Sequence, residues 1–81
     1  MKYTLITFDT KTNSLVAKTE CNGYVSLKQF VELAEKHGYK AFTVFYNTEH
    51  NTNCFEPKGN TTYEDVHSIN KNYSDWESFY K

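Results

Sequence analysis

The sequence of 81 residues contains no arginine, because all nine of its basic residues are lysines. Arginine makes the best bidentate contacts to phosphates and base edges, so its absence disfavours sequence-specific reading of DNA. Cysteine is scarce as well, with two residues in the chain. Two are too few for the disulfide framework of a small secreted protein, so we expect Cys21 and Cys54 to be free thiols.

Long hydrophobic runs are also missing. Met1 and Lys2 lead into an alternating pattern and not into the apolar core of a signal peptide, and no run approaches the roughly 20 residues that cross a bilayer. We therefore expect no membrane contact and a location in the cytoplasm. With 38% hydrophobic and 17% aromatic residues, the chain has enough apolar side chains to form one core. This predicts a single compact domain over residues 1–81.

The first half of the sequence predicts a hairpin. Residues 2–8 (KYTLITF) alternate between apolar and polar, and residues 14–20 (SLVAKTE) follow after the turn-rich stretch 9–13 (DTKTN). Alternation of this kind on both sides of a turn is typical of two paired antiparallel strands.

An amphipathic helix is predicted next, over residues 27–37. Ser26 and Gln29 have the spacing of a capping box at its start, and Gly38 stands where a glycine commonly ends a helix. One apolar face of this helix should meet the sheet. Its members are Leu27, Phe30, Val31 and Ala34, with Leu33 at its flank.

The strand predicted over residues 40–46 (KAFTVFY) is apolar on both faces. Phe42, Val44 and Tyr46 point one way, and Ala41 and Phe45 point the other way. A single helix covers only one face of a sheet. The opposite face must therefore meet the C-terminal segment, a second subunit or another protein.

The remainder predicts a short edge strand and helical pieces. Residues 54–57 (CFEP) form the strand, closed by Pro57. A cap formed by Thr61 with Glu64, or by Thr62 with Asp65, precedes residues 63–69, and a second capping box precedes the last residues; its members are Ser74 and Glu77. The predicted fold class is α+β: a small antiparallel sheet made of the hairpin, the central strand and the edge strand, with one amphipathic helix on one face and a short helical C-terminal segment.

The chain shows no self-evident catalytic, cofactor or metal site. In the polar run 46–57, His50 and Cys54 are the only close pair of metal-ligand types, whereas zinc needs three or four converging ligands. A nucleophilic pair of Cys54 and His67, oriented by Asp65, has the right residue types but needs separate segments to converge. We therefore predict no metal, no cofactor and no enzymatic activity.

The last residues of the chain carry an aromatic stripe flanked by acids. Tyr73, Trp76 and Tyr80 recur at helical spacing, which predicts one shared face. This stripe either covers the open face of the sheet or serves as a docking surface, since Trp and Tyr are favoured in interfaces. The predicted partner-binding residues are Tyr73, Asp75, Trp76, Glu77, Phe79 and Tyr80.

Protein binding is thus the predicted function. In its small size, its arginine-free composition and its lack of catalytic groups, the chain resembles the small accessory proteins with which phages block host or defence proteins. That resemblance implies an inhibitor that binds a host or defence protein directly, in the cytoplasm of a bacterial host cell. Two alternatives stay open: a symmetric homodimer, and a binder of RNA or single strands that stacks bases on Tyr3, Phe42 or Tyr46 beside lysines.

Overall fold

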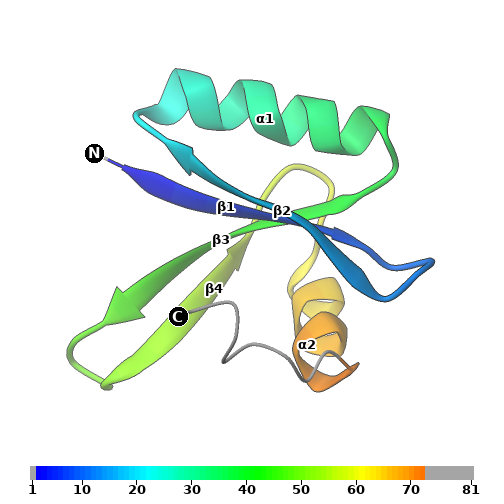
Figure 1. Ribbon diagram of the computed structural model, residues 1–81. Helices are drawn as coiled ribbons and strands as arrows, with labels where there is room; N and C mark the ends of the chain where they lie inside the picture. Colours follow the sequence, from blue (N-terminus) through cyan, green and yellow to red (C-terminus); the bar gives the residue numbers. More distant parts are fainter. Residues whose placement is uncertain (1, 73–81) are drawn as a thin grey trace.

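The computed structural model describes residues 2–72, which form a four-stranded antiparallel sheet with one helix on each face (Figure 1). Strand order in the sheet is β2-β1-β3-β4, so β2 and β4 are its edges. The predicted α+β class is confirmed. The elements are β1 (Tyr3–Asp9), β2 (Ser14–Cys21), α1 (Tyr24–Lys36), β3 (Lys40–Asn47), β4 (Thr52–Pro57) and α2 (Tyr63–Asn72).

The predicted hairpin of β1 and β2 is confirmed, and it contains a β-bulge. Thr7 pairs with Ala17 and Phe8 pairs with Leu15, so Val16 is an extra residue on β2. A bulge of this kind interrupts the ladder and increases the local twist. The regular part of β2 is therefore residues 17–21.

Helix α1 begins earlier than predicted, and the capping box at its start is wrong. Its N-cap is Gly23, in extended conformation and without a side-chain cap, while Ser26 lies inside the first turn. Leu27 donates its N–H to the Gly23 carbonyl at 3.0 Å. The chain thus passes from β2 into the helix through Asn22 and Gly23, and packing on the sheet takes the place of a capping side chain. The predicted end of the helix is confirmed. Gly38 follows the C-cap residue His37 and adopts φ +76°, the left-handed conformation in which a glycine commonly ends a helix.

The two faces of the sheet carry separate cores, which we name the α1 face and the α2 face after the helix that covers each (Figure 1). Alternation along β3 places Ala41 on the α1 face and Phe42 on the α2 face, as predicted. The core of the α1 face consists of Leu5, Cys21, Leu27, Val31, Ala34 and Ala41. The core of the α2 face consists of Ile6, Phe8, Phe42, Val66 and Ile69.

The second apolar face of β3 is therefore covered by α2. Of the three predicted alternatives, this is the one in which the C-terminal segment meets that face. Val66 and Ile69 of α2 pack over Phe42, and Phe55 of β4 meets the Phe42 ring edge-on at 5.7 Å between centroids. Cover is incomplete toward the other end of β3, where Phe45 and Tyr46 are about half exposed, on opposite faces.

The connection between β4 and α2 shows which of the two predicted caps precedes α2. Asp65 donates its N–H to the Thr62 hydroxyl at 3.1 Å, and Thr62 donates its N–H to the Asp65 carboxylate at 3.0 Å. This reciprocal pair is a capping box. The edge strand closed by Pro57 is also confirmed, whereas the box of Ser74 and Glu77 lies outside the described residues.

Neither of the helices formed by residues 2–72 is long and apolar enough to span a bilayer.

Candidate binding surface

The two flanks of α1 differ sharply in chemistry. Successive residues of a helix are about 100° apart, so the buried stripe of Leu27, Val31 and Ala34 leaves a flank on each side. Phe30 and Leu33 lie on the flank above β2. Lys28 and Glu35 lie on the opposite flank, above the connection from β4 to α2.

The apolar flank borders a groove of about 220 Å³ between α1 and the β1–β2 hairpin, here called the α1/β2 groove. Three of its apolar side chains are substantially exposed: Leu33 by 50%, Val16 by 44% and Phe30 by 39%. Contiguous exposed apolar side chains are typical of interaction sites, unlike apolar residues scattered singly over a surface. The principal lining residues are Val16, Ala17, Thr19, Phe30, Leu33 and His37.

Two of the residues that line the α1/β2 groove have stacked rings. His37, the C-cap residue of α1, lies over Tyr39 with 5.9 Å between ring centroids and 26° between planes. Tyr39 packs against the core of the α1 face. The stacked pair therefore gives the groove an aromatic wall, in which Tyr39 is held by the core.

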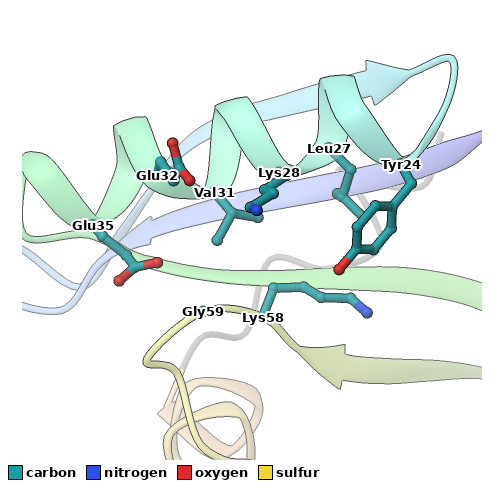
Figure 2. Close-up of a pocket in the computed structure, with 8 residues that line it drawn as sticks. All are labelled: Tyr24, Leu27, Lys28, Val31, Glu32, Glu35, Lys58 and Gly59. Atoms are coloured by element: carbon teal, nitrogen blue, oxygen red, sulfur yellow. The ribbon is translucent and has the colours of Figure 1, made fainter.

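The polar flank of α1 borders a second cleft, of about 240 Å³ (Figure 2). Leu27 and Val31 form its apolar floor, while Lys28, Glu32, Glu35 and Lys58 supply two charges of each sign at its rim. Figure 2 shows the Glu35 carboxylate directed toward Gly59 and the Tyr24 ring reaching toward Lys58.

One of the charged side chains of this cleft already forms an ion pair within the protein. Lys58 Nζ lies 3.1 Å from Glu56 Oε1. Both the cleft and the α1/β2 groove are smaller than the 300–1,000 Å³ usual for small-molecule sites, but the cleft also carries charges of both signs, which favour no single ligand charge. The cleft is the weaker candidate of the two.

The structure does not bring together the residues predicted as a nucleophilic triad. Cys54 pairs with Phe45 across β3 and β4, which places it on the α1 face, whereas His67 lies on α2 over the other face. Asp65 is engaged by Thr62 and, at 3.3 Å, by Lys40. The N–H of Thr62 and the nearby Lys40 ammonium hold the pKa of the Asp65 carboxyl below its usual value.

The two cysteines are free thiols. Cys21 is fully buried beneath α1, and burial raises the pKa of its thiol. A buried thiol of this kind is an inert core residue, since thiolate chemistry needs a lowered pKa and access. Among residues 2–72, no three side chains of His, Cys, Asp or Glu gather as a group that could hold a metal ion.

The aromatics named as a stacking platform for nucleic acid do not form one. Phe42 is fully buried under α2. Tyr3 packs against the core of the α1 face, on the opposite side of the sheet. Tyr46 is exposed and donates its hydroxyl to the Asn51 side chain.

The α1/β2 groove was not foreseen from the sequence, although one signal for it was present. The predicted apolar face includes Phe30 and has Leu33 at its flank, yet Leu33 lies about 160° around the helix from Val31 at 100° per residue. So wide a separation predicts that Leu33 leaves the sheet. The predicted partner-binding residues of the C-terminal stripe lie outside the described residues.

Comparison of the chain with protein-family models, with curated proteins and with solved structures finds no match.

Proposed function

We propose that this protein is a non-enzymatic protein-binding module and that the α1/β2 groove is its docking surface. The observation that carries the proposal is the exposure of Val16, Phe30 and Leu33 along one groove. These side chains come from two elements and lie beside an edge strand. Apolar contacts and a free strand edge are then available to the same partner.

The edge position of β2 defines how a partner binds. The outer side of an edge strand presents backbone N–H and C=O groups that a further strand can pair with. In strand addition, backbone hydrogen bonds supply affinity and alternate side chains enter pockets on the face of the sheet. An extended segment added along β2 directs its side chains on the α1 face into the groove below Phe30 and Leu33.

The narrower form of this proposal is an accessory protein that blocks a host or defence protein. Its support is compositional: the chain is small and lysine is its only strongly basic residue type. The nucleic-acid alternative lacks a stacking platform among residues 2–72, because Phe42 is buried and Tyr3 lies on the opposite face from Tyr46.

A charge placed in the groove tests the proposal. We expect tagged wild-type protein to retain a protein partner from cells that express it natively, and Leu33→Asp to lose that partner, because the substitution puts a carboxylate in the apolar contact. Val25→Asp is the matched control. Val25 is 72% exposed on the same helix and does not line the groove, so this variant should retain the partner.

Circular dichroism melting of both variants separates binding from folding. Since Leu33 is half exposed, both variants should melt within a few degrees of the wild type. Identical retained proteins for wild type and Leu33→Asp, with both folded, would contradict the proposed docking surface.

A further inference from the structure

We propose that the partner seated at the α1/β2 groove is a second copy of this chain, joined by antiparallel pairing of the two β2 strands about a two-fold axis at Thr19. This inference rests on the proposed function, since it uses the same groove and names its occupant. It joins two four-stranded sheets into one continuous sheet through their β2 edges.

The limits of the regular ladder in β2 select the centre of the pairing. The bulge at Val16 interrupts the strand on one side, and β2 ends at Cys21 on the other. Residues 17–21 are the stretch that can continue a ladder, and Thr19 is its midpoint. An antiparallel pair centred on Thr19 therefore matches this stretch with itself.

The charges on β2 select the same register. Lys18 and Glu20 are both exposed and lie on the α2 face, opposite Ile6 and Thr4 of β1. Pairing centred on Thr19 places Lys18 of each copy directly across from Glu20 of the other, twice by symmetry. Opposite charges in directly facing positions stabilise a strand pair, and like charges destabilise it.

The neighbouring symmetric registers lack this complementarity. Two-fold pairing keeps residues of the same face opposite each other, so the centre must fall on a residue. A centre at Lys18 faces that lysine with its own copy, and a centre at Glu20 does the same for the glutamate. A centre at Ala17 places Lys18 across from Val16, in the bulge.

The helices complete the interface on the other side of the joined sheet. A two-fold axis perpendicular to the sheet keeps both α1 helices on one face, with their β2-side flanks directed at each other. These flanks carry Phe30 and Leu33, which are exposed in the single chain. The small residues Ala17 and Thr19 line the groove from β2, so they lie where the two strands pair. The apolar residues of the α1 flanks lie above them.

Sedimentation equilibrium over a micromolar concentration series tests the register. We expect the wild type to dimerise, and Lys18→Glu and Glu20→Lys each to raise the dimer Kd at least about tenfold, because two pairs become like-charged. The double variant K18E/E20K restores opposite charges with unchanged composition, so its Kd should return to near that of the wild type. Lys28→Glu, on the other flank of α1, is the charge control and should dimerise normally.

Other outcomes overturn the inference. A monomeric wild type would mean that the bulge and the charges of β2 protect its edge from pairing, as they do in many sheets. A double variant no better than the single variants would refute the register. If the wild type is monomeric and Leu33→Asp still loses a retained partner, the second copy fails as occupant while the docking surface stands. If Leu33→Asp changes neither dimer nor partner, both proposals fail.

Discussion

The hydroxyl of Thr61 accepts the backbone N–H of Ala41 at 2.9 Å, in a site where both residues are buried. Lys58 donates its N–H to the Ala41 carbonyl at 3.0 Å. The connection from β4 to α2 thus satisfies both backbone groups of one β3 residue. This contact fixes where the chain crosses from the edge of the sheet to its α2 face.

Thr61→Val removes the acceptor and keeps the shape of the side chain. The Ala41 N–H is then buried without a partner, which should lower the free energy of unfolding by about 1–3 kcal/mol. Thr61→Ser retains the hydroxyl and is the control. Urea denaturation should place its midpoint between those of the wild type and Thr61→Val, and equal midpoints for Ser and Val would show that the hydrogen bond contributes nothing.

Gly59 packs against α1 in a way that excludes a side chain. Its φ is +61°, and a Cβ there would lie 2.3 Å from Glu35 Oε1 and 2.8 Å from Val31 Cγ1. Gly38 has a similar φ of +76° but open space around it. Gly38→Ala should therefore cost about 1 kcal/mol, from backbone conformation alone.

Gly59→Ala should cost clearly more than Gly38→Ala in thermal or urea unfolding. The Glu35 carboxylate can swing aside, whereas the branched Val31 side chain is fixed in the core, so α1 and the connection must move apart. Equal losses in the two alanine variants would indicate that the close approach is not tight in solution.

The features of the fold that depend on neighbouring residues could be predicted from the sequence, whereas a feature that depends on packing between distant segments could not. The hairpin, β3, the edge strand closed by Pro57 and the end of α1 at Gly38 follow from local alternation and turn chemistry, which neighbouring residues determine. The start of α1 did not follow, because packing on the sheet outweighed the local signal of Ser26 and Gln29.

The candidate site was beyond sequence analysis for a related reason. Strand order makes β2 an edge, and no local pattern encodes strand order. Exposure of Val16 depends on that order and on the bulge, and exposure of Phe30 depends on where α1 lies across the sheet.

The Thr62–Asp65 capping box should make stability depend on pH in acid. The folded-state pKa of Asp65 lies below its ordinary value of 3.8, first because of the Thr62 N–H and also because of Lys40. A lowered folded pKa means that the ionised carboxylate stabilises the native state, fully above the unfolded pKa and less as the pH falls through the folded one.

Asp65→Asn removes the charge and keeps an oxygen that can accept the Thr62 N–H. The wild type should be more stable than Asp65→Asn at pH 7, and the difference in unfolding free energy should shrink as the pH falls below about 4. Chemical denaturation at several pH values measures this. A difference that stays constant down to pH 2 would show that the charge of Asp65 does not matter to the cap.

The single tryptophan of the chain gives a direct test of the predicted C-terminal stripe. We expect Trp76 to pack toward the sheet face left open by α1, where Val44 and Phe55 are only partly buried. Its fluorescence emission should then be blue-shifted in native buffer, and Trp76→Ala should cost about 3–5 kcal/mol of stability. Native emission identical to that in denaturant, with normal stability of the variant, would contradict this packing.

The most direct test of the account is a disulfide across the proposed two-fold axis. In a Cys54→Ser background, Thr19→Cys places two thiols opposite each other in the paired β2 strands, with a Cα separation of about 4.5–5.5 Å that suits a disulfide. Mild oxidation at low protein concentration should give a covalent dimer within the folded state, and the same treatment of Ser14→Cys, beyond the bulge, should not. Rapid crosslinking of Ser14→Cys and none of Thr19→Cys would contradict the proposed pairing.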